Sequence, residues 1–392
     1  MNQALLAELL ERAWGEGDEA LAASRSLFRD WVEPLGDSFT EEGVRAYVDG
    51  FAAVVARVLP EWTADGLAAR YERIRRGRRF QDDPARVRDV VVLSRVTLGA
   101  DVAVTSVVMD AALRHFPNAL IHLAGNEKNA GLFAGAERVR HFPTPYARTG
   151  ALRDRLAASA GLGRALCEQL PPEALVLDPD SRLSQLGLVP VWHEERYFFF
   201  ESRTAGADRA DSLGRLASRW CHECLGVEGR AWTKPAQGLG GPARICVSLG
   251  TGENPAKGLG AECERELVRR LVVLGRPILI DKGMGGEEGL RVEQAIAHSG
   301  AAAGQIETWL GPFAPFAREI ARAPLYVGYD SAGQHVAAAA GTPLRCLFAG
   351  APSQRFFERW KPAGRGECRV ARVDARAHWR QALETLGLGN ST

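Results

Sequence analysis

The sequence has no long hydrophobic run: none approaches the ~20 consecutive apolar residues that a membrane-spanning helix requires. Its first stretch, MNQALLAELLERAWGEGDEALAA, carries acidic side chains where a secretory signal would carry basic ones. We therefore expect a cytoplasmic protein.

An excess of one charge is also lacking. Lys and Arg total 49 and Asp and Glu total 48, so the formal net charge is +1. This balance argues against a general electrostatic grip on nucleic acid. The run Arg73 to Arg79, RIRRGRR, is a local exception. Its simpler interpretation is a solvated helix end, and the alternative is contact with an anionic partner such as a lipid surface.

Cysteine is sparse. Seven in 392 residues do not form a disulfide framework. Cys221 and Cys224 make a C-x-x-C, but no second pair follows at the spacing of a zinc site, so two thiols on one helix face are the simpler explanation. Asp178-Pro179-Asp180 has the D-x-D form that can hold a divalent metal. Pro179 marks a turn there and Asp180 can cap the next segment, so we predict no metal site.

A chain of this length predicts two or three domains. Residues 1–86 show apolar side chains at helical spacing throughout. From Asp89 onward, short β-branched runs alternate with helical patterns, and the Gly- and Pro-rich stretch 233–244 separates two such series. Strands are expected in DVVVLSR, ALIHLAG, EALVLD and RYFFFES, and then in ARICVSLG, PILID, PLYVGYD and PLRCLFAG.

The predicted fold class is therefore α/β, with two doubly wound Rossmann-like domains that face a cleft. We predict a helical N-terminal extension (1–86), an N-terminal Rossmann-like domain that takes the acceptor (87–236) and a C-terminal one that takes the donor (237–392). Ligands of such sheets bind beyond the carboxyl ends of the strands. The loops at those ends are where chemistry is expected.

The first such loop, SRVTLGAD, ends in Asp101 at the expected start of a helix. A carboxylate there is stabilised by the helix dipole, and it can accept the proton of a hydroxyl nucleophile. The alternative is an ordinary N-cap, which the residues alone favour.

The second loop, GTGENPAKG, brings Gly250 and Gly252 close to a ligand and places Lys257 before the next helix. Backbone N–H groups and an ammonium that converge at a strand-to-helix junction suit a phosphate. The spacing is neither that of a Walker loop nor G-x-G-x-x-G, which disfavours a dinucleotide oxidoreductase.

The third loop runs from Asp330 to His335 and leads into another helix. The helix N-terminus offers N–H groups, Ser331 and His335 add donors, and Gly333 is expected to keep the surface open to a pyrophosphate. The alternative is that Asp330 is an N-cap and His335 a packed core residue.

Three motifs together resemble glycosyltransferase family 9, the ADP-heptose:lipopolysaccharide heptosyltransferases, over roughly residues 88–388. The family's S-x-x-G-D turn corresponds to TLGAD, its P-G-A-x-x-G-P-A-K-x-W to LGTGENPAKGL, and its D-[ST]-G-x-x-H-x-A-A-A to DSAGQHVAAA. The chain departs from the family at Ala100, which separates Gly99 from Asp101, at Leu259 in place of tryptophan, and at Ala332 in place of glycine.

The resemblance implies a GT-B fold and an inverting sugar transfer without a metal or a cofactor. It implies Asp101 as the catalytic base. It also implies a nucleotide-sugar donor, ADP-linked in the family, and a glycan or glycolipid acceptor such as lipopolysaccharide, with peripheral contact at the inner membrane face. The implied donor-binding residues are Gly250, Thr251, Lys257, Asp330, Ser331, Gly333 and His335.

Two alternatives remain open. One is a different enzyme on the same fold, a sugar-nucleotide epimerase or hydrolase. The other is a binding or scaffold protein whose catalytic site has decayed. The loops 282–288 and 308–315 are expected to contact the base and the sugar, but the sequence does not orient them.

Overall fold

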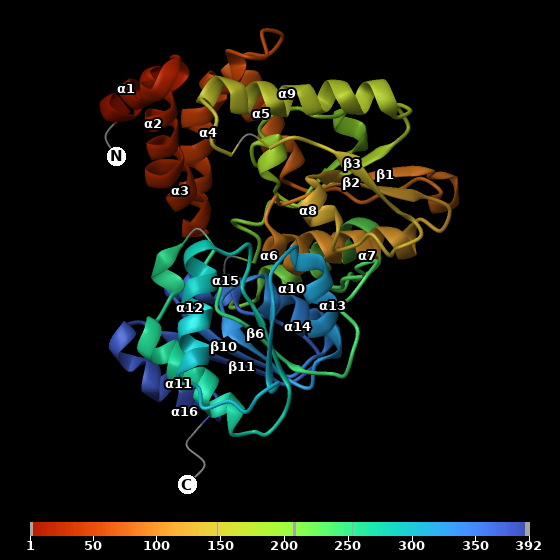
Figure 1. The fold of residues 1–392 in the computed structure, drawn as a ribbon. Helices are drawn as coiled ribbons and strands as arrows, with labels where there is room; N and C mark the ends of the chain where they lie inside the picture. The colour runs from red at the N-terminus through yellow and green to blue at the C-terminus, as the bar shows by residue number, and fades with distance from the viewer. Residues whose placement is uncertain (1–2, 147, 207–208, 253, 389–392) are drawn as a thin grey trace. The chain divides into compact units, whose positions relative to one another are not determined.

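The computed structural model describes residues 3–146, 148–206, 209–252 and 254–388. Contacts divide these residues into two compact units. The first unit comprises Met1–Thr97, Val107–Ala130 and Arg138–Arg230, and the second comprises Leu98–Ser106, Gly131–Glu137 and Ala231–Thr392, each taken without its undescribed residues. Each unit contains one parallel sheet with helices on both faces (Figure 1).

The N-terminal segment is helical, as its periodicity predicts. Its helices are α1 (Gln3–Trp14), α2 (Gly17–Leu27), α3 (Glu33–Ser38), α4 (Glu41–Ala56) and α5 (Ala64–Ile74), with a π-helical turn at Phe28–Val32. Thr40 caps α4, because its hydroxyl accepts the backbone N–H of Gly43 at 3.1 Å.

The first unit's sheet has five strands in the order β3-β2-β1-β4-β5, and every pair is parallel. Helices α7 and α9 cover opposite faces of its strands (Figure 1). The expected strands are confirmed, whereas β3 and the long helix α9 were not predicted. The elements are β1 (Asp89–Leu93), α7 (Ser106–His115), β2 (Leu120–Gly125), α8 (Glu127–Ala130), β3 (Val139–Pro143), α9 (Leu152–Gln169), β4 (Leu175–Asp178), β5 (Tyr197–Phe199) and α10 (Leu213–Leu225).

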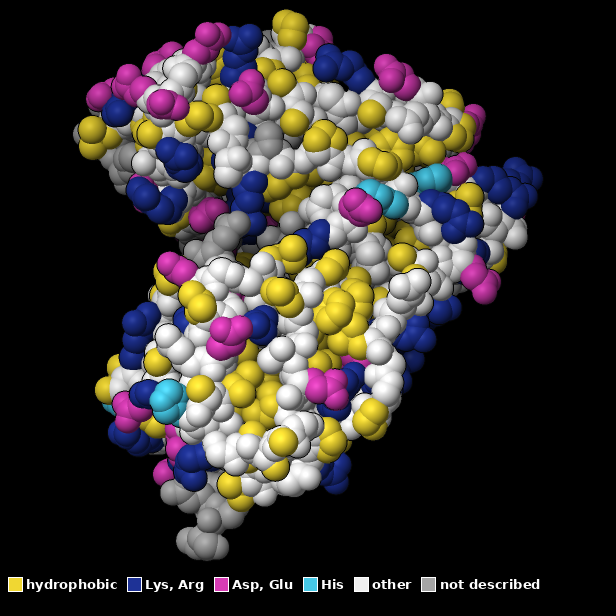
Figure 2. Space-filling view, in the orientation of Figure 1, with side chains coloured by type: hydrophobic (Ala, Val, Ile, Leu, Met, Phe, Trp, Pro, Cys, Tyr) yellow, Lys and Arg dark blue, Asp and Glu magenta, His cyan; other side chains and the backbone are white. Residues whose placement is uncertain are grey.

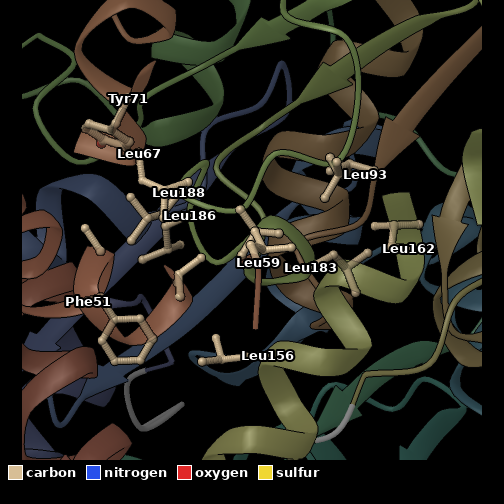
Figure 3. Close-up of a cluster of buried hydrophobic side chains, with 14 of the residues drawn as sticks. Phe51, Leu59, Leu67, Tyr71, Leu93, Leu156, Leu162, Leu183, Leu186 and Leu188 are labelled. Atoms are coloured by element: carbon tan, nitrogen blue, oxygen red, sulfur yellow. The ribbon is translucent and has the colours of Figure 1, made fainter. Parts of the chain in front are cut away.

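The N-terminal helices share one hydrophobic core with the rest of the first unit. Phe51 and Leu67, from α4 and α5, lie in the same buried cluster as Leu156 of α9 and Leu186 of the loop after β4 (Figure 3). The segment 1–86 is therefore packed as part of the first unit, although its sequence pattern suggested a separate extension.

Buried hydrogen bonds join the same helices to the loop after β4. The hydroxyl of Tyr47 donates to the carbonyl of Gln185 at 3.0 Å, and the Arg70 guanidinium donates to the carbonyl of Gly187 at 3.0 Å. Arg203 donates to the Tyr71 hydroxyl at 2.8 Å. Because unpaired buried carbonyls are costly, these helices also satisfy the polar backbone of that loop.

Several arginines of the basic run at the end of α5 form ion pairs and ring contacts with other residues of the first unit. Arg73 makes a two-pronged ion pair with Glu194 at 2.8 and 2.9 Å, and Arg75 binds Glu41 at 2.7 Å. The Arg78 guanidinium lies 4.6 Å from the centre of the Phe198 ring. On the face shown in Figure 2, acidic and basic side chains are intermixed over the N-terminal helices. These contacts favour a structural role for the run.

The two candidate metal motifs are internal as well. Cys221 and Cys224 are buried on α10, and burial raises the pKa of Cys224 to about 12. Asp178 accepts hydrogen bonds from the Ser181 backbone and the Tyr197 hydroxyl, and Asp180 pairs with Arg203 at 3.2 Å. Within the described ranges, no group of three or more His, Cys, Asp or Glu residues is placed to hold a metal ion.

The second unit's sheet has six parallel strands in the order β11-β10-β9-β6-β7-β8. Helices α11 and α16 lie on one side of it and α13 and α14 on the other (Figure 1). The outermost strands, β8 and β11, were not predicted. The elements are β6 (Ile245–Ser248), α11 (Ala261–Val272), β7 (Ile278–Asp281), α12 (Gly286–Ala297), β8 (Ile306–Trp309), α13 (Phe313–Arg322), β9 (Tyr326–Tyr329), α14 (Ala332–Ala340), β10 (Leu344–Ala349), α15 (Gln354–Trp360), β11 (Cys368–Val373) and α16 (Trp379–Thr385).

The strand order of the second sheet reverses between β6 and β9. From β6 the chain runs outward through β7 and β8, and then returns to the other side of β6 with β9. Ligands of doubly wound sheets bind at such a reversal, beyond the carboxyl ends of the strands. Loops 249–260 and 330–331 follow these two strands. Among the helices that the structure describes, none has the length and apolarity needed to cross a membrane.

Replacement of Phe51 by alanine tests whether the N-terminal helices hold the first unit together. Phe51 is fully buried in the shared core, so Phe51→Ala should lower the stability of the first unit by about 3–5 kcal/mol. Thermal unfolding followed by circular dichroism measures the loss. The matched control is Leu5→Ala, because Leu5 is 58% exposed. Equal melting temperatures for the two variants would refute the shared core.

Candidate functional site

An ion pair joins the two loops at the strand-order reversal. The Lys257 ammonium lies 2.7 Å from Oδ2 of Asp330 and donates to the Asp330 carbonyl at 3.0 Å. The Asp330 side chain is almost fully buried, whereas that of Lys257 is 23% exposed. The sequence named both residues, and the structure brings them into direct contact. The pair places one positive charge, still reachable from solvent, beside the start of α14.

A hydrogen-bond network of Arg291, Glu264 and Tyr329 holds both ends of the Lys257 loop. Arg291 donates to the carbonyl of Leu249 at 2.7 Å and to Glu264 at 2.9 Å. The Tyr329 hydroxyl donates to the same carboxylate and accepts the backbone N–H of Leu259, both at 3.2 Å. The loop is thus tied where it leaves β6 and where it approaches α11. Leu259, which replaces the family's tryptophan, is buried in the core of this unit.

Gln334 links the acidic and imidazole groups of the third loop. Its amide nitrogen donates to Oδ1 of Asp330 and lies 3.4 Å from Nε2 of His335. Its amide oxygen accepts from the Cys346 thiol at 2.8 Å. Because the thiol is a donor, it directs the amide oxygen toward β10 and the amide nitrogen toward the loop. Gln334, which is fully buried, therefore orients Asp330.

His335 is a neutral ring in this environment. Burial is the main cause that lowers the pKa of His335 to about 4; Asp330 acts to raise this pKa, and Lys257 acts more weakly to lower it. If Nε2 accepts from Gln334, the ring carries its proton on Nδ1 and can act as a donor there. His335 is thus both a packed residue and a polar group.

The glycines and hydroxyls of the two loops have different roles. Gly252 has φ +57° with no atom within 4 Å of an added Cβ, so the loop stays open there. A Cβ on Gly333 would lie 2.1 Å from the Tyr326 hydroxyl. Gly333 is buried and lets α14 approach β9, so the expectation that it keeps the surface open is wrong. Ser331 is the N-cap of α14 without a side-chain capping bond, and Thr251 is half-buried beside Gly250.

Asp101 lies inside a helix and not at its N-cap, because the helix begins at Leu98. Residues Asp101–Thr105 form a π-helical turn between α6 (Leu98–Ala100) and α7. The Asp101 side chain is fully buried, and its Oδ1 accepts the Thr105 hydroxyl at 2.6 Å. The N-cap interpretation of Asp101 is therefore wrong.

The helical turn that carries Asp101 packs against α14. A Cβ on Gly99 would lie 3.3 Å from Cδ2 of His335 and 3.5 Å from Cα of Ala332. A side chain at this position would therefore be in tight contact with the His335 ring. Residues Leu98–Ser106 accordingly belong to the second unit, together with the Lys257 and Asp330 loops. The sequence had suggested Asp101 on the opposite domain.

Comparison with known structures identifies the architecture. The fold is of the GT-B type. At a TM-score of 0.56 and 15% identity, the chain is similar to E. coli heptosyltransferase WaaC with ADP, over 76% of this chain and 99% of that one. It is similar to a family 9 glycosyltransferase from Veillonella parvula DSM 2008 with a TM-score of 0.55 and 15% identity, over 79% of this chain and 99% of that one.

A third structure, E. coli ADP-heptose lps heptosyltransferase II, matches with a TM-score of 0.52 and 15% identity over 76% of this chain and 98% of that one. No protein-family model matches the sequence, and no curated protein sequence matches it. The similarity in fold agrees with the resemblance that the three motifs indicated.

Sequence reasoning missed the residues that support the site. Gln334, Thr105 and Arg291 each stand at a position that the motifs leave variable or do not include. Thr105 lies four residues after Asp101 on one helical stretch, and Gln334 lies four residues after Asp330, which precedes α14; this spacing allows contact. That spacing was the available signal. No comparable signal pointed to Arg291.

The buried state of His335 predicts a pH dependence of stability. Its pKa in the folded protein is about 4, below the ~6.5 of an unfolded chain. The stability that it contributes is therefore present above about pH 6.5 and is lost as the pH falls toward 4, on the order of 3 kcal/mol in all. His335→Gln should melt at temperatures that vary less over this interval. His298→Gln, at an exposed histidine, is the control. A wild-type slope retained in His335→Gln would contradict the assignment.

Proposed function

We propose that this chain is a glycosyltransferase that moves a sugar from a nucleoside-diphosphate donor to a hydroxyl of a glycan or glycolipid. The observation that carries the proposal is the Lys257–Asp330 pair at the β6/β9 reversal, with the Asp101 turn packed on the helix that follows Asp330. The ion pair and the Asp101 turn both belong to the second unit, which supports a common site for the donor diphosphate and the acceptor hydroxyl.

The donor diphosphate is proposed to bind between Lys257 and the N-terminus of α14. The first turn of this helix offers backbone N–H groups and the positive end of its dipole. Ser331 adds a hydroxyl at the N-cap. Gly250 and Thr251, in the loop after β6, are the proposed contacts from the other loop. As the bond to the sugar breaks, negative charge grows on the departing diphosphate, and fixed donors stabilise this charge more than that of the intact donor.

Asp330 has a different proposed role. A carboxylate repels phosphate, but it accepts hydrogen bonds from sugar hydroxyls. Lys257 and Gln334 hold both of its oxygens in place. The neutral ring of His335 can donate to the donor without adding a charge to the site. The pair of loops thus offers cationic, neutral and anionic groups for the distinct parts of a nucleotide-sugar.

Asp101 is the proposed base. It takes the proton of the acceptor hydroxyl while the acceptor oxygen attacks the anomeric carbon from the side opposite the diphosphate, which inverts that carbon. Asp101 is fully buried, so the acceptor hydroxyl must reach it in a site from which bulk water is excluded. Exclusion of water favours transfer over hydrolysis of the donor.

The donor that we propose is an ADP-linked heptose or a similar sugar, with a lipopolysaccharide-like acceptor. Support comes from the similar folds of WaaC with ADP and of WaaC with ADP-2-deoxy-2-fluoro heptose. The proposed reaction uses no metal and no cofactor. The proposed site of action is the cytoplasmic face of the membrane that holds such an acceptor.

Nucleotide binding is the first test. ADP at about 100 times its Kd should stabilise the second unit by about 2.7 kcal/mol and raise its melting temperature. Lys257→Met should remove most of this shift, because the diphosphate loses its main counter-charge. Lys128→Met, at an exposed lysine of the first unit, should retain the shift. UDP and GDP in parallel report the base preference. A full ADP shift in Lys257→Met would contradict the proposed cradle.

Removal of the proposed base is the second test. Asp101→Asn should lower kcat for sugar transfer by about 10²–10⁴-fold, with donor binding retained, because the amide cannot accept the proton. Asp154→Asn, at an exposed carboxylate, is the control. The assay follows a labelled nucleotide-sugar with and without acceptor and identifies every product.

The products separate the alternative functions. Free sugar with or without acceptor would indicate a hydrolase, and an isomerised sugar still on the nucleotide would indicate an epimerase. Nucleotide-sugar that binds without turnover would indicate a scaffold. Full transfer by Asp101→Asn would refute its role as base.

A further inference from the structure

The turn that holds Asp101 departs from α-helical hydrogen bonding. The N–H of Ser106 donates to the carbonyl of Asp101, five residues back, so this turn contains one residue more than an α-helical turn. The carbonyl of Val102 would be the α-helical acceptor of that N–H. It accepts the Ser106 hydroxyl instead, at 2.6 Å. The Ser106 side chain thus provides a hydrogen bond to the Val102 carbonyl, which lacks its α-helical donor because of the extra residue.

A π-helical turn does not by itself indicate a site. Another occurs at Phe28–Val32, among the N-terminal helices. The turn at Asp101 differs because it holds a fully buried carboxylate and a fully buried hydroxyl, joined at 2.6 Å. This distance lies in the range of a hydroxyl that donates to an ionised oxygen. The turn also lies against α14, where the proposed donor site begins.

We propose that Thr105 is a positioning residue for the base, a role that rests on the proposed function of Asp101. Its hydroxyl holds Oδ1 of Asp101 and so fixes the rotation of the carboxylate. It also stabilises the ionised form, which is the form able to accept a proton. During transfer the acceptor's proton goes to Asp101, the acceptor oxygen bonds to the anomeric carbon, and the bond from that carbon to the diphosphate breaks. Thr105 keeps its own proton.

Helix α14 packs against the turn that holds Asp101. The titratable residue on α14 is His335, and burial lowers the pKa of its ring to about 4. Lys257 and Asp330 form a mutual ion pair just before that helix. Trp232, from the segment after α10, makes two hydrogen bonds to Ser106 and carries no charge. Substitution of Thr105 leaves these groups unchanged.

Three variants separate positioning from structure. Thr105→Val removes the hydroxyl and keeps the branched shape, whereas Thr105→Ser keeps the hydroxyl. Ser106→Ala removes the neighbouring hydroxyl, which bonds the Val102 carbonyl and not the carboxylate. All three are compared with the full-length wild-type chain for melting temperature, donor KM, and kcat from about pH 5 to 9.

The carboxylate-bound hydroxyl predicts a specific pattern. Thr105→Val should lower kcat about tenfold and move the acid limb of its pH profile up by about one unit, because protonation of the base becomes easier. The donor KM should stay within about twofold. Thr105→Ser should restore both kcat and the profile, and Ser106→Ala should lower the melting temperature without moving the acid limb. A folded Thr105→Val with the wild-type kcat and profile overturns the proposal.

A readout that needs no turnover separates this inference from the proposed function. In a double-mutant cycle of thermal stability, Thr105→Val and Asp101→Asn should couple at pH 7 and should couple less at pH 4, where a carboxylate becomes protonated. Independent effects at both pH values overturn the proposed bond. If the cycle couples but no donor supports transfer, the proposed function fails and the positioning role falls with it. If Asp101→Asn abolishes transfer and Thr105→Val does not change it, only the positioning role fails.

Discussion

The ion pair between Lys257 and Asp330 is the contact on which the candidate site depends. It can form because the strand order of the second sheet reverses between β6 and β9, so the loops after these two strands meet at one edge. Two sets of hydrogen bonds fix its geometry. Gln334 donates to Asp330, and the Arg291–Glu264–Tyr329 network holds the ends of the Lys257 loop. A fixed charge pair costs less reorganisation when an anion binds than two mobile side chains would.

Much of the fold could be predicted from the sequence because most central strands are buried on both faces. Such strands read as continuous apolar runs, and β1, β4, β6 and β9 do so. The strands that were missed, β3, β8 and β11, lie at the edges of the two sheets and mix exposed polar with apolar residues. Their identity depends on pairing with a neighbour, which a local pattern does not contain.

The residues of the candidate site also fall into two groups, those that the sequence predicts and those that it does not. Lys257, Asp330 and His335 were predictable because phosphate chemistry and the family resemblance both single them out. Gln334 and Arg291 were not, since their roles depend on which strands and helices are adjacent. Gly333 was named for a wrong reason, because its lack of a side chain is required by Tyr326 behind it. A motif identifies important residues, but it does not show whether a residue is needed for ligand binding or for packing.

Ala100, where the sequence departs from the family motif, is followed directly by the π-helical turn that holds Asp101. Before the turn, Gly99 packs closely against His335 and Ala332 of α14. Beyond Ser106 the helix continues into α7, whose apolar side chains are buried in the first unit. Between these two flanks lies the π-helical turn Asp101–Thr105, which contains one residue more than an α-helical turn. The Ser106 hydroxyl offsets the carbonyl that this turn leaves unpaired, and Thr105 holds the carboxylate. The departure at Ala100 is thus next to a turn in which the Asp101 carboxylate has a defined partner, the Thr105 hydroxyl.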